Sequence, residues 1–136
     1  MLMSALSNNP IHCLDCNLEV APEALPLPEA MVDSVAHWGW VAGAIHTMEL
    51  DSGPYEHWAE TELMDLTSPI NREGLEVRRQ LDTVRRCYYL LFQPLAEGGF
   101  RVPDECPGCG GPFMEYSGGR FTRLLCERCS LSLVNP

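Results

Sequence analysis

Apolar side chains recur at helical spacing through the first third of the chain. Between residues 31 and 48 they return every three or four positions, at Met31, Val35, Trp38, Val41, Ala42, Ile45 and Met48. A stripe with this period lies along one face of an α-helix, so the pattern predicts an amphipathic helix over residues 29–50. Pro28 suits the start of this helix, and the run Asp51-Ser52-Gly53-Pro54 ends it.

Two shorter helices are predicted after that turn. Residues 55–64 form the first, and we expect Trp58 and either Leu63 or Met64 to face the core. Pro69 then interrupts the pattern. Asn71 is the residue that we expect to cap the next helix, over residues 72–83, because its side-chain oxygen can accept a hydrogen bond from a free N–H group.

The later part of the chain is rich in residues that favour β-strands. Residues 87–92 are aromatic and apolar, and Pro94 follows them, as in a buried strand that ends there. Further short strands are predicted at 100–102, 113–116 and 121–125, the last two joined by a turn at Gly118-Gly119. These elements predict an α+β fold, in which a small helical layer accompanies a short antiparallel sheet.

Four cysteines in the last third of the chain indicate a metal site. Cys106 and Cys109 form one Cys-x-x-Cys pair, and Cys126 and Cys129 form another after sixteen intervening residues. Two such turns supply the tetrahedral four-sulfur shell that structural zinc prefers. The strands around them predict a C-terminal zinc ribbon, in which the ion has no free coordination position.

The chain divides into three predicted parts. Residues 1–28 form a loose leader with a proline-rich linker, residues 29–97 form a helical α+β body, and residues 98–136 form the zinc ribbon. The leader contains a third pair, Cys13 and Cys16, which is compatible with a second zinc, a free thiol pair or a reversible disulfide. The candidates for the two further ligands that a second zinc needs are His37, His46, His57 and Cys87.

Acidic residues dominate the first half of the chain. Residues 1–71 contain eleven carboxylates and no lysine or arginine, whereas nine arginines and eight carboxylates follow. Such a surface repels phosphate backbones and attracts a basic partner, although acidity also serves solubility alone. The carboxylates predicted to contact a basic protein are Glu49, Asp51, Glu56, Glu60, Glu62 and Asp65.

Arginines are spaced along the predicted third helix. Arg72, Arg79 and Arg86 are seven residues apart, as are Arg78 and Arg85, which places them along one side of the helix. This stripe could bind nucleic-acid phosphates, and the contact residues would then be Arg72, Arg78, Arg79 and Arg85. It could instead dock against the acidic half of the chain or a partner, which is the role that we favour from sequence.

The sequence contains no recognisable signal peptide, membrane span or catalytic group, and our expectations about location and activity follow from this. Asn8, Asn9 and Pro10 interrupt the first residues, so no signal-peptide core forms, and no apolar run reaches membrane-spanning length. We therefore expect a cytoplasmic protein with reduced cysteines and no membrane association. We also expect no enzymatic activity, because no open metal site or activated nucleophile can be assembled, and Cys87 is expected to be a buried structural residue.

Three sequence runs resemble one family of bacterial proteins. They are Asp51 to Ala59 (DSGPYEHWA), Ser68 to Leu75 (SPINREGL) and Cys87 to Phe92 (CYYLLF), followed by the terminal ribbon. The family consists of zinc-ribbon-containing proteins of unknown function that are described as candidate nucleic-acid-binding proteins, and the resemblance covers residues 51–133. It implies a metal role for Cys106, Cys109, Cys126 and Cys129 and no catalytic residue. Small acidic proteins with such a ribbon are also similar to immunity proteins, which mask a basic nuclease toxin.

The sequence therefore predicts a non-enzymatic zinc-binding protein with a basic protein partner. The sharper hypothesis is an immunity or inhibitor protein that neutralises a nuclease-like toxin domain by steric and electrostatic occlusion. The alternative is a nucleic-acid-binding zinc-ribbon protein that uses the arginine stripe together with the ribbon.

Overall fold

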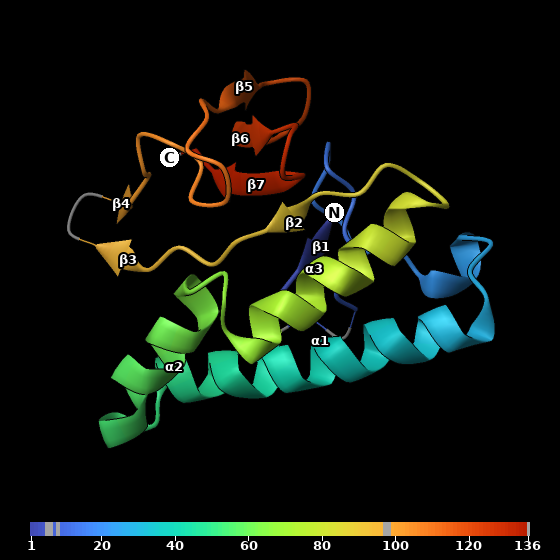
Figure 1. The fold of residues 1–136 in the computed structure, drawn as a ribbon. Helices are drawn as coiled ribbons and strands as arrows, with labels where there is room; N and C mark the ends of the chain where they lie inside the picture. Colours follow the sequence, from blue (N-terminus) through green and yellow to red (C-terminus); the bar gives the residue numbers. More distant parts are fainter. Residues whose placement is uncertain (5–6, 8, 97–98, 136) are drawn as a thin grey trace.

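Three α-helices and a five-stranded sheet form the fold in the computed structural model, which describes residues 1–4, 7, 9–96 and 99–135 (Figure 1). The helices are α1 (Glu29–Leu50), α2 (Glu56–Met64) and α3 (Pro69–Asp82), with short 3-10 turns η1 (Pro22–Ala24) and η2 (Gly53–Tyr55). In Figure 1, α3 lies between α1 and the strands. The predicted bounds of the first helix are confirmed. Among the described helices, none is both long enough and apolar enough to cross a membrane.

The sheet has the strand order β1-β2-β7-β6-β5 and is mixed. Its strands are β1 (Leu2–Met3), β2 (Tyr89–Leu90), β5 (Met114–Tyr116), β6 (Arg123–Cys126) and β7 (Leu131–Val134), and β3 (Leu95–Ala96) and β4 (Gly99–Phe100) form a separate hairpin. β1, β2 and β7 run parallel, whereas β7, β6 and β5 alternate in direction. The α+β class is confirmed, but the sheet has a parallel half where we expected antiparallel strands throughout.

The parallel pairs join segments that are far apart in the chain. Leu2 of β1 lies opposite Tyr89 of β2, and Tyr89 lies opposite Leu131 of β7. Parallel pairing needs a long connection, which the helices provide between β1 and β2 and the ribbon provides between β2 and β7. One sheet therefore includes strands from the predicted leader, body and ribbon.

The start of the chain is not the loose leader that we predicted. Leu2 is fully buried, and Ile11 and His12 are nearly so. Leu2 N donates a hydrogen bond to Tyr88 O at 2.8 Å. The side chains of Leu2 and Ile11 belong to the main core, and their burial fixes a segment whose composition suggested a flexible one.

The core is centred on Trp38 of α1. Its side chain is fully buried and lies edge to face against Tyr89, with ring centroids 5.7 Å apart, and Nε1 donates to Ile70 O at 3.0 Å. Gly74 of α3 allows this approach, since a Cβ there would lie 2.5 Å from Tyr89 Cε2 and 2.7 Å from Trp38 Nε1. Helices α1 and α3 and the sheet therefore meet at one close contact.

The other two tryptophans are on the surface. Trp40 is 76% exposed and Trp58 is 47% exposed, so the prediction that Trp58 faces the core is wrong. Leu63 is buried as expected, and Ala59 forms the buried face of α2 with it. These two positions, four residues apart, fix the inward side of a short helix, and Trp58 lies outside it.

Asn71 connects α2, α3 and the sheet. It is 2% exposed, and its Oδ1 accepts a hydrogen bond from Tyr89 OH at 2.6 Å. Its Nδ2 donates to three carbonyl oxygens at the end of α2, those of Leu63 (2.9 Å), Asp65 (2.8 Å) and Glu62 (3.1 Å). The carbonyls of Glu62 and Leu63 lie in the last turn of α2, where the helix itself supplies no donor, so the Asn71 side chain satisfies the C-terminus of α2.

The cap of α3 is Ser68, and the prediction of Asn71 is wrong. Ser68 Oγ accepts a hydrogen bond from Asn71 N at 3.3 Å, and the helix begins at Pro69. Proline suits the first helical position because an N–H group there would have no partner within the helix. Our prediction treated Pro69 as a break and placed the helix start too late.

Candidate metal centre

Cys106, Cys109, Cys126 and Cys129 meet between two tight turns. Their Sγ atoms all lie within 4.8 Å of one another, and Cys109 Sγ is 3.6 Å from Cys126 Sγ. Cys106 and Cys126 are buried, and the other two are half-buried. Within the described residues, this is the one group of three or more potential ligands that could share an ion. The four cysteines are therefore positioned to bind a metal ion.

Glycines shape the first of these turns. Cys106 N donates to Gly111 O at 2.8 Å, and Gly110 N donates to Cys106 O at 2.8 Å, so the turn is closed from both ends. Gly110 has a φ angle of +65°, which favours glycine. A Cβ at Gly108 would lie 3.0 Å from Cys129 Sγ, so a larger residue there would crowd a ligand atom.

The second turn leads directly from β6 into β7. Cys126 ends β6, Leu131 begins β7, and Ser130 between them has a φ angle of +52°. Tyr89 N of β2 donates to Ser130 O at 2.8 Å. The parallel pairing of β2 with β7 therefore begins at the metal-binding turn itself.

Burial and hydrogen bonding move the thiol pKa values in opposite directions. Burial is the main cause of the raised pKa of Cys106. Burial and hydrogen bonds with the neighbouring thiols together raise the pKa of Cys129 to about 12. A hydrogen bond from the backbone N–H of Gly111 is the main cause that lowers the pKa of Cys109 to about 7. Without a cation, part of the cluster therefore keeps its protons, and binding of a metal ion would release them.

The donor set fits structural zinc. At the usual Zn–S distance of about 2.3 Å, sulfurs at the corners of a tetrahedron are roughly 3.8 Å apart. The separation of Cys109 and Cys126, 3.6 Å, is close to that value. Four sulfurs complete the coordination shell, so no position is left for water or a substrate. An ion in this site would stabilise the fold and would have no catalytic position.

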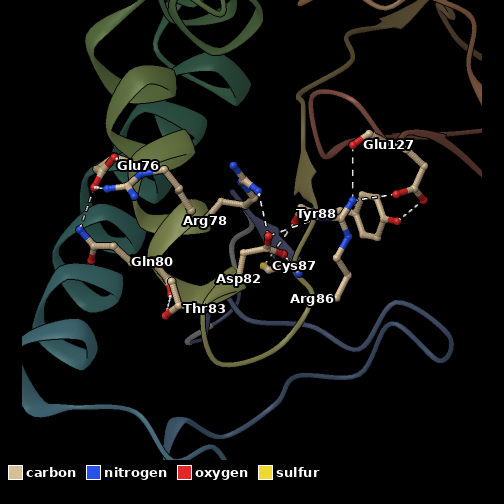
Figure 2. Close-up of polar contacts among 10 residues, drawn as sticks. Glu76, Arg78, Gln80, Asp82, Thr83, Arg86, Cys87, Tyr88 and Glu127 are labelled. Atoms are coloured by element: carbon tan, nitrogen blue, oxygen red, sulfur yellow. Dashed lines mark hydrogen bonds and ion pairs between the residues drawn. The ribbon is translucent and has the colours of Figure 1, made fainter.

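Glu127 holds the second turn against the rest of the protein (Figure 2). Its carboxylate accepts hydrogen bonds from Tyr88 OH and from Arg86 Nη2, the latter at 2.7 Å. The Tyr88 hydroxyl, together with Arg86, lowers the pKa of Glu127. The Arg86 guanidinium also lies 4.9 Å from the centre of the Tyr88 ring and 3.4 Å from Asp82. Residues at the start of β2 and the end of α3 thus support the metal-binding turn.

Several arginines of α3 pair within the C-terminal half. Arg79 donates two hydrogen bonds to Glu76, at 2.9 and 2.7 Å. Arg78 lies 3.7 Å from Asp82 (Figure 2). The other predicted contact residues, Arg72 and Arg85, are exposed. Among the ion pairs of the described residues, none joins an arginine to a carboxylate of residues 1–71. In the part of the chain that the structure describes, the arginine stripe therefore makes no ion pairs with the acidic first half.

A hollow of about 460 Å³ lies between α3 and the metal-binding turns. Arg72, Arg78 and Arg79 line it from the helix, and Gly108 and Cys129 line it from the ribbon. The predicted arginine stripe and the predicted metal ligands thus border one space, although they are far apart in the sequence.

The six carboxylates predicted to contact a partner lie around the end of α1 and along α2. Glu56 Oε1 accepts from Ser52 N at 3.3 Å and from Gly53 N at 2.8 Å. Asp65 Oδ1 accepts from Thr67 N at 2.8 Å, and this bond lowers the pKa of Asp65. The other four are Glu49, Asp51, Glu60 and Glu62. The hydrogen bonds from Thr67 favour the charged form of Asp65.

Cys13 and Cys16 form a separate turn and are both half-buried. No third histidine, cysteine or carboxylate in the described ranges lies close enough to complete a metal site with them. Of the predicted candidates, His37, His46 and His57 lie 3.8, 3.9 and 3.7 Å from Glu73, Glu49 and Glu60, and Cys87 is buried. A second zinc held by one chain alone is therefore not supported.

The supporting role of Glu127 was not predicted. A carboxylate inside a Cys-x-x-Cys turn adds negative charge beside thiolates, and this could have suggested a cationic or hydroxyl partner. Its partners Tyr88 and Arg86 are 39 and 41 residues earlier in the chain. No local pattern connects positions so far apart.

Comparisons with protein-family models, curated proteins and solved structures gave no significant match for this chain. The resemblance to zinc-ribbon-containing bacterial proteins is therefore supported by the clustered cysteines alone. The function has to be inferred from the surfaces and sites described above.

Proposed function

We propose that this chain is a non-enzymatic zinc-binding protein that binds a basic protein partner through the surface around η2 and α2. The observation that carries this proposal is an acidic surface with exposed aromatic side chains. Tyr55 is 59% exposed and Trp58 is 47% exposed. Glu62 follows Trp58 by four residues and so lies on the same side of α2.

Such a surface suits a cationic partner. Tyrosine and tryptophan are frequent anchors in protein interfaces, because each buries a large area with little loss of side-chain freedom. The carboxylates around them would speed association with a basic protein, and this effect would weaken with salt. Residues 1–71 contain no lysine or arginine that would compete for these carboxylates.

The specific form of this function that we propose is inhibition of a nuclease-like toxin, as by an immunity protein. A nuclease binds phosphates with cationic side chains, so an acidic surface could occupy that site and exclude the nucleic acid. Zinc at the four cysteines would hold β7 in place, and through it the sheet against which α3 lies. Reduced thiols are needed for this, and we therefore place the protein in the cytoplasm.

The proposal can be tested with cationic nuclease domains, beginning with any that are encoded beside this gene. Each domain would be purified and titrated with the zinc-loaded protein, and binding and nuclease activity would be measured. We expect one-to-one binding that weakens with salt and abolishes the activity. Trp58→Ala combined with Glu62→Gln should weaken binding at least tenfold.

Trp40→Ala is the matched control, because it removes an even more exposed tryptophan from α1. It should leave the affinity unchanged. The proposal fails if none of these nuclease domains binds, or if the variants at Trp40 and Trp58 behave alike.

The second candidate function is nucleic-acid binding at the hollow between α3 and the metal-binding turns. Three arginines line this space, and only Arg79 among them makes a close bidentate pair, with Glu76. Fluorescence anisotropy with labelled single-stranded and duplex oligonucleotides at low salt tests this candidate. Arg72→Gln and Arg78→Gln should then weaken binding and reduce its salt dependence. No anisotropy change at low salt would exclude it.

A further inference from the structure

The turn that contains Cys13 and Cys16 has the hydrogen bonds of a metal-binding turn. Hydrogen bonding from the backbone of Cys16 and Asp15 lowers the pKa of the Cys13 thiol. Asn17 N donates to Cys13 O at 3.0 Å, which closes the turn. Both cysteines therefore lie in one closed backbone turn.

The turn of the metal centre has the same construction. Cys106 O accepts a hydrogen bond from the N–H of the residue four positions later, Gly110, at 2.8 Å, as Cys13 O does from Asn17 N at 3.0 Å. The residue after the second cysteine has a positive φ angle in all three Cys-x-x-Cys pairs. These angles are +59° at Asn17, +65° at Gly110 and +52° at Ser130. Cys13 and Cys16 therefore share the backbone geometry of the pairs that form the metal centre.

The ribbon fixes this turn in place. Asp15 O accepts from Arg120 N at 2.6 Å, and the Asp15 carboxylate accepts from Tyr116 OH. Gly119 lies so close to the Asp15 backbone that a Cβ would overlap it. The buried Arg123 donates to Asn17 Oδ1 at 2.7 Å. Little rearrangement would be needed for the turn to bind an ion.

The turn supplies two sulfur ligands and no more. The neighbouring His12 is not free to bind an ion, because its Nδ1 lies 3.0 Å from Asn17 O and its Nε2 lies 3.0 Å from Asn9 O. No other potential ligand among the described residues completes a group of three. Zinc requires four ligands in a structural site, so two thiolates do not suffice for it. The soft d¹⁰ ion Cu⁺ prefers thiolates and forms stable two-coordinate complexes with them.

We propose that Cys13 and Cys16 form a two-thiolate binding site for Cu⁺, separate from the four-cysteine metal centre. One Cu⁺ ion replaces the thiol protons and leaves a complex with one negative charge. No oxidation or reduction is involved. The site is half-exposed, so the ion can enter and leave without unfolding of the ribbon.

The test is a Cu⁺ titration of the zinc-loaded full chain under nitrogen. Bathocuproine disulfonate competes for Cu⁺, and a zinc-sensitive dye reports loss of zinc from the ribbon. We expect the first equivalent of Cu⁺ to bind without zinc release. In Cys13→Ser and Cys16→Ser the affinity for this equivalent should fall at least 100-fold, so added Cu⁺ should then displace zinc.

Cys87→Ser is the matched control, since it removes a buried thiol outside the pair. It should keep the first Cu⁺ equivalent, and a zinc content of one per chain shows that each variant is folded. Zinc release by the first equivalent in the unmodified protein would overturn the proposal. So would a second zinc per chain that depends on Cys13 and Cys16, because the pair would then be part of a four-coordinate zinc site.

Discussion

The helical layer and the ribbon are held together by different means. In the helical layer, the fully buried Trp38 and the nearly buried Asn71 connect three helices to β2 through close packing and hydrogen bonds. In the ribbon, short strands surround four thiols that lie within 4.8 Å of one another. Packing is intrinsic to the chain, whereas the thiol cluster needs a cation. The two regions should therefore respond differently to metal removal.

The largest effect should come from loss of the metal. Cys126→Ser, or removal of the ion by a chelator, should unfold the ribbon, because structural zinc sites supply apparent binding energies of about 10–16 kcal/mol. Zinc analysis should show no bound metal. Hydrogen exchange should show loss of protection in β6 and β7, while α1 keeps part of its protection. Full protection of the ribbon in metal-free protein would contradict this account.

Trp38→Ala should have the next largest effect and should act on the helical layer. Removal of a fully buried tryptophan costs about 3–5 kcal/mol of unfolding free energy. Urea unfolding of the zinc-loaded protein would measure it. Trp40→Ala, the exposed neighbour, should change the unfolding free energy by less than about 0.5 kcal/mol. Equal effects of the two substitutions would mean that the core is not centred on Trp38.

Asn71→Ala should destabilise the helical layer by about 2–3 kcal/mol, because carbonyl groups at the end of α2 and the Tyr89 hydroxyl lose their partner. Tyr89→Phe removes one of these bonds and should cost about 1 kcal/mol. Both values come from urea unfolding. If Asn71→Ala costs no more than Tyr89→Phe, the bonds to α2 contribute little to stability.

Glu127→Gln should have the smallest effect, about 0.2–1 kcal/mol, because the Arg86 pair is near the surface. The hydrogen bond from Tyr88 lowers the pKa of Glu127 from its usual 4.5 in the folded state. Its contribution is therefore complete above pH 4.5 and is lost as the pH falls toward the lower folded value. Urea unfolding in excess zinc should show a difference from the unmodified protein at pH 7 that shrinks at pH 4.

Sequence patterns identified the parts of this fold that depend on short-range spacing. The helix over residues 29–50 was found because a stripe repeated through about five turns leaves little ambiguity. The four-cysteine cluster was found because a two-residue gap between ligands is itself a geometric constraint. In both cases the signal lies within a few residues of the feature that it predicts.

Features that depend on distant parts of the chain were missed. β1 is a strand because β2 offers it an edge, and its two residues carry no alternating pattern of their own. β7 was not predicted, because it begins just after Cys129 and no turn signal separates it from the metal-binding turn. Trp58 is expected in the core only because tryptophan is large and apolar. The inward face of a short helix depends on which side packs against neighbouring elements, and in α2 that side carries Ala59 and Leu63.

The central position of β7 has a consequence for how the protein folds. β7 is the last described strand in the chain, yet it lies between β2 and β6, and β1 pairs with β2 at the far edge. The apolar β2 therefore has no β7 to pair with until most of the chain has been synthesised. Contacts between such distant residues make folding slow. During synthesis, the helices can form early, while the strands stay open to contacts with other chains until the ribbon closes.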